Sequence, residues 1–236
     1  MTDPSLSMDP SVMVAQALSA RVPERVDPWL ERRMHTFGAS EALTLLIALG
    51  WEQPDASTPA YVVKAAGKLF AVKAGLRKPD KTGQAAELGS EAERPLVEQW
   101  NADPFSGWPE TVHADAIPRE FLPLIDRRQP RLSWTPDGWC RLRGALVPVE
   151  VKTDQRGGRT APARHWIWQV QQAMGTCDAA CALILYGPGW ASWRGHDGGE
   201  IVPWVVERDE AMIARLREAA AAGWERVEKM RKENSK

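Results

Sequence analysis

Several features that mark common protein classes are scarce in this chain of 236 residues. Its three cysteines are too few for a closed disulfide framework, and no two of them have the CxxC spacing. The cysteines therefore do not indicate a zinc or iron–sulfur site. No apolar run approaches the roughly 20 residues of a bilayer-spanning helix, and the polar start MTDPSLSMDP does not resemble a secretion signal. We expect a cytoplasmic protein without a membrane partner.

An excess of one charge is also lacking. The chain has 30 Lys and Arg against 31 Asp and Glu, a net charge of −1, whereas nucleic-acid-binding domains usually show a basic excess or patch. Arginines gather instead around residues 138–153. They are Arg127, Arg128, Arg131, Arg141, Arg143, Arg156, Arg159 and Arg164. This clustering suits a phosphate backbone that passes an acidic centre, and ordinary surface solvation explains it equally well when the motifs are ignored.

The hydrophobic pattern predicts an α/β protein. With 44% hydrophobic and 26% charged residues, we expect one domain over residues 1–236, with tails at 1–8 and 232–236. Helices are predicted near 9–21, 38–49, 61–76, 84–101, 162–175 and 208–232, and strands near 130–135, 138–143, 146–153, 181–186 and 201–206. Because 181–186 is continuously apolar, helices should cover a mixed sheet on both sides.

Asp137, Glu150 and Lys152 form the most informative group in the sequence. Residues two apart on a strand point to the same face, so Glu150 and Lys152 should share one face while the valines between them face the other. A hairpin that turns at Gly144 would bring Asp137 near Glu150. Pro148 has no N–H to donate, so we expect the returning strand to be bulged there or exposed on that edge.

Two carboxylates and an ammonium group are suited to metal-assisted hydrolysis of a phosphodiester. Mg²⁺ prefers carboxylate oxygens together with waters and substrate phosphate, and Mn²⁺ is the alternative. We therefore interpret Asp137 and Glu150 as metal ligands and Lys152 as the group that positions the water or neutralises the transition state. Taken alone, an ExK triplet is more typical of an ordinary amphipathic strand, with Glu150 and Lys152 as a solvated pair.

Five segments of the chain share their order and approximate spacing with one nuclease family. They are WLERRMHTFGASEA, ELGSEAERP, TPDGW, PVEVKT and WIWQVQQAM. Together they resemble the lambda-exonuclease and YqaJ-type branch of the PD-(D/E)xK superfamily, over most of the chain. The resemblance implies a restriction-endonuclease-like core with a mixed central sheet flanked by helices, a helical N-terminal part and a long C-terminal helix.

The resemblance also implies roles for further residues. Arg33 and Ser40 match the pair that holds the terminal 5′-phosphate of DNA, and Glu93 matches a glutamate on a helix beside the metal. Gln169 matches the functional glutamine of the Q-V-Q helix. The metal ligands would then be Asp137, Glu150, Glu93 and the backbone carbonyl of Val151.

The implied activity is that of a Mg²⁺-dependent 5′-to-3′ exonuclease. Such an enzyme degrades one strand of linear double-stranded DNA and leaves a 3′ overhang for recombination in a bacterial or phage-infected cell. The family forms trimeric rings and often works beside a single-strand annealing protein. An endonuclease of restriction or repair built on the same core is the first alternative, and a catalytically inactive DNA-binding module is the second.

Some residues depart from the family pattern or have competing interpretations. The family often has proline directly after the helix glutamate, whereas Arg94 separates Glu93 from the proline here. Asp126 lies where a further acidic residue sometimes assists the metal, and we leave it unassigned. We interpret His165 as solvated or satisfied. Most of the 12 tryptophans should be core, with Trp134 and Trp139 the better candidates for stacking on bases.

Overall fold

A computed structural model describes residues 28–78, 84–102, 108–118, 121–154, 159–188 and 200–235. The helix expected at 9–21, the N-terminal tail and Arg156 lie outside these residues. None of the described helices combines the length and apolar character needed to cross a membrane.

A five-stranded mixed sheet forms the centre of the fold, with the order β2-β5-β6-β7-β8. Its strands are β2 (Thr111–His113), β5 (Gly138–Leu142), β6 (Ala145–Asp154), β7 (Cys181–Pro188) and β8 (Val202–Glu207). Neighbouring strands are antiparallel except β6 and β7, which are parallel. The parallel pair requires a crossover connection, and helix α7 (Arg164–Cys177) provides it.

Two helices cover opposite faces of this sheet. Helix α6 (Gln84–Ala102) packs on the face that carries Val147, Val149 and Val151. Helix α7 packs on the other face, against side chains of β7 such as Ile184. Side chains alternate between the two faces of the sheet along β6. Its valines are therefore buried under α6, and Glu150 and Lys152 point towards α7, as predicted from the sequence.

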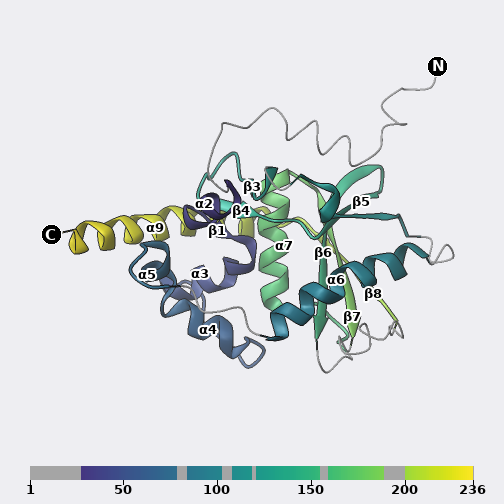
Figure 1. Ribbon diagram of the computed structural model, residues 1–236, viewed down its shortest axis with the longest axis horizontal. Helices are drawn as coiled ribbons and strands as arrows, with labels where there is room; N and C mark the ends of the chain where they lie inside the picture. Colours follow the sequence, from purple (N-terminus) through teal and green to yellow (C-terminus); the bar gives the residue numbers. More distant parts are fainter. Residues whose placement is uncertain are drawn as a thin grey trace, which may run out of the picture.

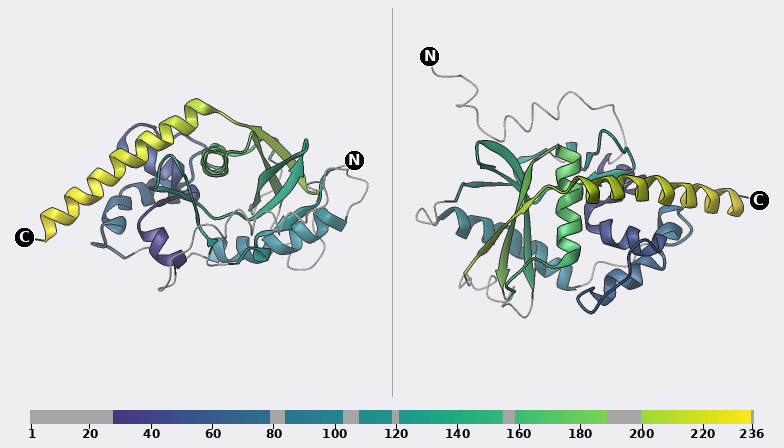
Figure 2. Two further views of the ribbon diagram at one scale, coloured as in Figure 1. Left: turned by 90° about the horizontal axis from the view of Figure 1, so that it is seen from above. Right: turned by 180° about the vertical axis from the view of Figure 1, so that it is seen from behind.

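The N-terminal helices and the C-terminal helix form a second layer of packing beside α7 (Figures 1 and 2). The N-terminal elements are α2 (Pro28–Met34), the 3₁₀ turn η2 (Ala39–Glu41), α3 (Ala42–Leu49), α4 (Ala60–Ala66) and α5 (Leu69–Lys73). Helix α9 (Glu210–Asn234) starts at Asp209, whose side chain accepts hydrogen bonds from two backbone N–H groups. Phe37, Leu45 and Leu216 belong to the core that joins these helices to α7 through Trp168.

A small second sheet has the strand order β1-β4-β3 and packs against α7. It consists of β1 (Phe37–Gly38), β4 (Leu132–Trp134) and β3 (Leu124–Ile125), and a 3₁₀ turn, η3 (Ala114–Ala116), follows β2. Gln172 of α7 donates to the carbonyl oxygens of Phe37 at 2.8 Å and Ser133 at 2.9 Å. This buried amide fixes the small sheet to α7.

Three expectations about the elements are wrong in detail. The strand expected near 130–135 belongs to the small sheet, and the unpredicted β2 is the first strand of the large one. The helix expected at 61–76 is interrupted after α4, where Gly67 and Lys68 separate it from α5. Pro148 is neither bulged nor on an edge, because it pairs with Trp139 and precedes the parallel ladder to β7, which starts at Val149.

Candidate active site

The β5–β6 hairpin brings the two predicted acids together. Arg143 and Gly144 occupy its turn with φ values of 54° and 80°, which are typical of the tight turns that match strand twist. The register pairs Gly138 with Val149, so Asp137 lies beside the next part of β6. Asp137 Oδ2 accepts a hydrogen bond of 2.9 Å from the N–H of Val151. The expected hairpin and its acid pair are therefore present.

Glu150 lies at the centre of the group and is 2% exposed. Its Oε1 accepts hydrogen bonds from Lys152 Nζ and from Gln169 Nε2. Its Oε2 is buried and has no hydrogen-bond donor among the residues that the structure describes. One oxygen of this carboxylate is thus engaged by two donors, while the other is available to a further partner, which a buried carboxylate needs.

The electrostatics follow from burial and from the second acid. Burial, and after it the neighbouring Asp137 carboxylate, raise the pKa of Glu150 to about 8, although Lys152 opposes both effects. Burial by itself would lower the pKa of Lys152, but Glu150, Asp137 and Glu93 raise it above its usual value. Lys152 is therefore a cation at neutral pH. A proton or a metal cation between the two carboxylates would relieve their repulsion.

The donors around Glu150 fit a hard divalent cation. Mg²⁺ is usually bound through one or two carboxylates and keeps several waters or substrate oxygens. Asp137 and the unpartnered Glu150 oxygen supply such a pair. Across the described ranges, no three His, Cys, Asp or Glu side chains are grouped closely enough to form a complete metal site. Water, phosphate or backbone oxygens would therefore have to complete the coordination.

Glu93 lies on α6, the helix that covers the other face of the sheet. It is half-buried on α6, and its charge contributes to the raised pKa of Lys152. Pro95 lies inside the same helix. The structure therefore places Glu93 near Lys152, whereas the contacts of Glu150 come from β6 and α7.

Arg33 and Ser40 lie on α2 and η2, and η2 packs against α7. Lys73 of α5 connects these two segments. Its ammonium donates to the backbone oxygen of Arg33 at 3.1 Å and forms an ion pair of 2.8 Å with Glu41. Glu41 in turn accepts a hydrogen bond of 2.8 Å from the N–H of Gly38. Lys73, which is 5% exposed, is a residue that sequence patterns did not identify.

The fold is similar to those of solved exonucleases, although the sequence matches no family model and no curated protein. An alkaline exonuclease, LHK-Exo, from Laribacter hongkongensis has a TM-score of 0.61 and 14% identity, over 89% of this chain and 96% of that one. The same enzyme in complex with dAMP has a TM-score of 0.60 and 14% identity, over 88% of this chain and 95% of that one. A phage-related exonuclease from Haemophilus somnus has a TM-score of 0.56 and 11% identity, over 84% of this chain and 96% of that one.

The fold is lambda-exonuclease-like. Within it, the arginines near the hairpin serve mainly other contacts. Arg131 lies 4.1 Å from the ring of Trp224, Arg143 pairs with Glu207 at 2.8 Å, and Arg164 pairs with Glu52 and Asp55. Each of these three arginines therefore has partners other than Asp137 and Glu150.

Burial and side-chain contacts also show the positions of two tryptophans and of Asp126. Trp134 and Trp139 are 1% and 6% exposed and pack edge to face at 5.0 Å. Both therefore belong to the core, as expected of most of the tryptophans, and these two candidates for stacking on bases are not placed to do so. Asp126 is 1% exposed. Its carboxylate binds Arg217 at 3.0 Å and accepts the N–H of Arg128 at 2.7 Å. These contacts make Asp126 a structural residue.

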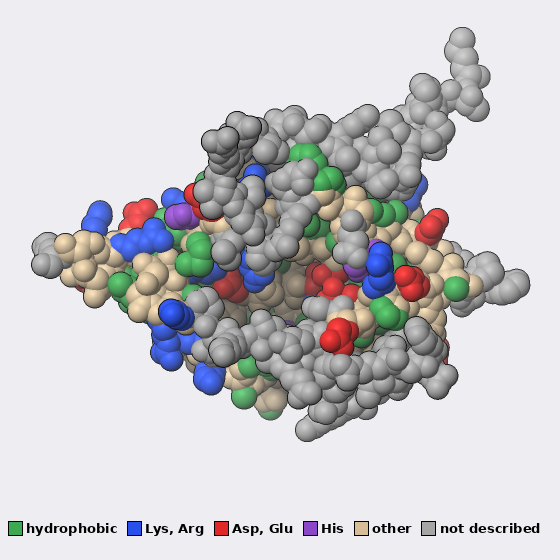
Figure 3. All heavy atoms as spheres, viewed as in Figure 1, with side chains coloured by type: hydrophobic (Ala, Val, Ile, Leu, Met, Phe, Trp, Pro, Cys, Tyr) green, Lys and Arg blue, Asp and Glu red, His purple; other side chains and the backbone are tan. Residues whose placement is uncertain are grey.

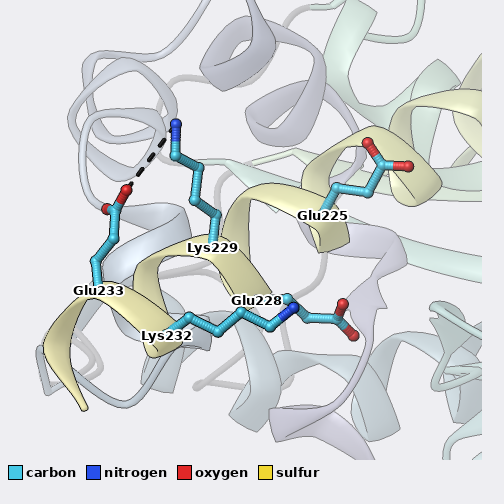
Figure 4. A pocket seen from close by; sticks show the side chains of 5 residues that line it. All are labelled: Glu225, Glu228, Lys229, Lys232 and Glu233. Carbon is cyan, nitrogen blue, oxygen red and sulfur yellow. Dashed lines mark ion pairs between the residues drawn. The ribbon is translucent and has the colours of Figure 1, made fainter. Parts of the chain in front are cut away.

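Two further features lie on the surface of the molecule. Acidic, basic and histidine side chains gather around a hollow near the middle of the face in Figure 3. A separate pocket lies along the outer half of α9. It is lined by Glu225, Glu228, Lys229, Lys232 and Glu233 (Figure 4). Because its lining mixes both charges on one helix, this pocket offers no acid pair like that of Asp137 and Glu150.

Proposed function

We propose that this chain is a Mg²⁺-dependent exodeoxyribonuclease that degrades linear double-stranded DNA from its 5′ ends and leaves 3′ overhangs. The observation that carries the proposal is the Glu150 carboxylate, buried beside Asp137, held by Lys152 and Gln169, and left with one unpartnered oxygen. The fold shared with solved exonucleases supports it, and one of those structures contains a nucleotide, dAMP.

Asp137 and Glu150 would hold the metal, Mg²⁺ or alternatively Mn²⁺, together with the carbonyl oxygen of Val151. Glu93, the further ligand that the sequence resemblance implies, would have to approach this pair to join them, because the described side chains form no group of three ligands. In a strand, the N–H and C=O of one residue point to the same neighbouring strand. Because the Val151 N–H points to Asp137, the Val151 carbonyl faces the same edge. When bound, the ion supplies a water of lowered pKa and neutralises charge on the phosphate.

Lys152 and Gln169 have complementary roles in the proposal. The Lys152 side chain is 19% exposed, so its ammonium can reach a phosphate at the surface while the surrounding acids keep it protonated. It stabilises the negative charge that develops on the phosphate. The Gln169 amide holds the Glu150 carboxylate and can orient the attacking water without changing its own protonation.

Arg33 and Ser40 would read the DNA end. A guanidinium and a hydroxyl that bind the terminal 5′-phosphate set its distance from the scissile bond. The link from Lys73 to the Arg33 backbone and Glu41 supports this role, because it holds the two segments in a fixed relation. We extend the proposal to a single nuclease domain, a trimeric ring and an annealing partner, as the sequence resemblance implies.

The test compares 5′-phosphorylated linear duplex with covalently closed circular DNA in the presence of Mg²⁺. We expect progressive loss of the linear DNA alone, with nucleotides from the 5′ end released first. Lys152→Ala should slow this reaction by at least about 10²-fold, because it removes the charge that faces the phosphate. Lys229→Ala, on the exposed surface of α9, is the matched control and should leave the rate unchanged.

The same assay separates the alternatives. Cutting of the circle would identify an endonuclease, and binding without Mg²⁺-dependent cleavage would identify a DNA-binding module.

End recognition is tested with 5′-hydroxyl ends and with Arg33→Ala. The parent should prefer 5′-phosphorylated ends, and the variant should lose that preference. Equal rates for parent and variant on phosphorylated ends would contradict the role of Arg33.

A further inference from the structure

Tyr61 is an exposed aromatic residue that stands at the candidate active site. It lies on α4 and is 65% exposed. Its ring packs edge to face against His165 at 6.3 Å. His165 lies in the first turn of α7, four residues before Gln169. Tyr61 therefore faces, from the N-terminal layer, the helix end that leads to the Glu150 contact.

The surroundings of the two rings are cationic. The positive charges of Lys152 and Arg159 act on both Tyr61 and His165, and the Arg159 guanidinium lies 4.9 Å from the ring of Trp166. Burial, together with the charges of Lys152 and Arg159, lowers the pKa of His165 to about 4. His165 is thus a neutral ring that packs against Tyr61, and the charges of Lys152 and Arg159 act on both rings.

The segment that carries Tyr61 is basic, although the whole chain is not. Residues 56–78 contain five basic and no acidic side chains. Lys73 is buried and paired with Glu41, whereas Lys64, Arg77 and Lys78 are exposed. Lys and Arg side chains accordingly gather over α4 and α5 in Figure 3. This local excess of basic side chains suits a polyanion, such as a nucleic acid strand, that runs along the segment to the ring of Tyr61.

We propose that Tyr61 stacks on an unpaired base of the DNA strand at the active site, while the basic α4–α5 segment binds the adjoining phosphates. An exposed aromatic ring next to cations is the arrangement by which proteins bind single strands without reading sequence. Tyr61 would hold the strand as it approaches Lys152. The inference rests on the proposed nuclease function and adds a subsite for the nucleobase.

The test measures binding without metal, so that no cleavage occurs. The probe is a fluorescent duplex with a short unpaired 5′-phosphorylated end, made with normal bases or with abasic sites in that end. Tyr61→Ala should weaken binding of the normal probe by roughly five- to a hundredfold, and Tyr61→Phe should bind like the parent. For the abasic probe, parent and Tyr61→Ala should bind alike. Val63→Ala, also exposed on α4, should change neither.

Several results would overturn the inference. One is unchanged binding of the normal probe by Tyr61→Ala. Another is a loss of binding in Tyr61→Phe as large as that in Tyr61→Ala. A third is a loss in Tyr61→Ala that is as large on the abasic probe as on the normal one, which would indicate a structural or phosphate-binding role. Mg²⁺-dependent cleavage by the same proteins separates this inference from the proposed function. A parent that cleaves DNA while Tyr61→Ala binds normally would refute the subsite alone, whereas a parent that neither binds nor cleaves would refute both.

Discussion

At the scale of the residue, Glu150 combines burial with incomplete hydrogen bonding. A buried carboxylate is costly unless its oxygens are paired, yet Glu150 Oε2 has no donor and faces a second acid. Such unsatisfied groups are rare in folded proteins, and functional sites are where they are found. The same environment that suits a cation therefore makes the metal-free site unfavourable.

We predict that this environment makes the stability of the metal-free protein depend on pH through Glu150. Its pKa is about 8 in the folded protein against 4.5 without burial. Between these values the unfolded chain releases a proton that the folded chain retains, so stability falls as pH rises, by at most about 1.4 kcal/mol per pH unit. Above pH 8 the folded protein has also released this proton, so the contribution of Glu150 to stability is lost and the curve of stability against pH flattens.

Urea unfolding in the presence of a chelator, measured from pH 5 to 9 at intervals of about one unit, checks this prediction. Glu150→Gln keeps the shape of the side chain but cannot titrate, so its stability should fall less with pH than that of the parent. Glu98→Gln, on the exposed face of α6, should behave like the parent. Parallel curves for the parent and Glu150→Gln would contradict the raised pKa.

The sequence predicted the residues of the site that lie on one hairpin. Asp137, Glu150 and Lys152 were predictable because strand period and a short turn determine their relation locally. Their partner Gln169 required the family resemblance, since it comes from another element. Tyr61 and Lys73 could not be predicted, because their positions depend on how the N-terminal helices pack on α7, and no local pattern encodes that packing.

At the scale of the element, the same distinction holds for the fold. Helix α6, helix α9 and the β5–β6 hairpin were predicted closely, because their hydrophobic periods are long and consistent. Strand β2 has only three residues, too few to show an alternation. The assignment of β4 to a separate sheet depends on its pairing with β1 and β3, which is a contact between distant parts of the chain.

Gly138 is the position where β5 can least tolerate a side chain. A Cβ there would lie 2.8 Å from the backbone oxygen of Val112 and 3.0 Å from Thr111 Cγ2. We predict that Gly138→Ala separates β5 from β2, lowers the free energy of unfolding by about 1–3 kcal/mol and moves the adjoining Asp137. The rate of DNA cleavage per folded molecule should therefore fall as well.

Urea unfolding and the cleavage assay, applied to the same preparations, measure both effects. Gly67→Ala is the matched control, since the nearest atom to a Cβ there is 3.8 Å away and its φ of −64° suits alanine. It should retain stability and activity. A Gly138→Ala protein with the stability and cleavage rate of the parent would show that β2 does not position Asp137.

At the scale of the whole molecule, Asp126 connects parts that are distant in the sequence. From the turn between β3 and β4 it pairs with Arg217 of α9, and Arg217 also donates to the backbone oxygen of Gly175 at 3.0 Å. This buried pair therefore joins the small sheet, α9 and the end of α7. Breaking a buried pair by removing one partner leaves an uncompensated charge.

We predict that Asp126→Asn lowers the free energy of unfolding by about 3–5 kcal/mol while cleavage per folded molecule is retained. Urea unfolding and cleavage at a temperature where the variant is folded provide the measurement. Asp178→Asn, whose side chain is 75% exposed in its pair with Arg208, should cost less than about 1 kcal/mol. Loss of cleavage in a stably folded Asp126→Asn protein would instead indicate a role near the metal.

The local nature of the β5–β6 hairpin has a consequence for the order of folding. Asp137 and Glu150 are joined by a short turn and can meet as soon as the hairpin closes, within microseconds. Gln169 arrives only when α7 docks and β7 pairs in parallel with β6, and such non-local pairing is slower. The two acids therefore meet while water still surrounds them. Their dehydration is delayed until the helix that supplies the stabilising amide closes over them.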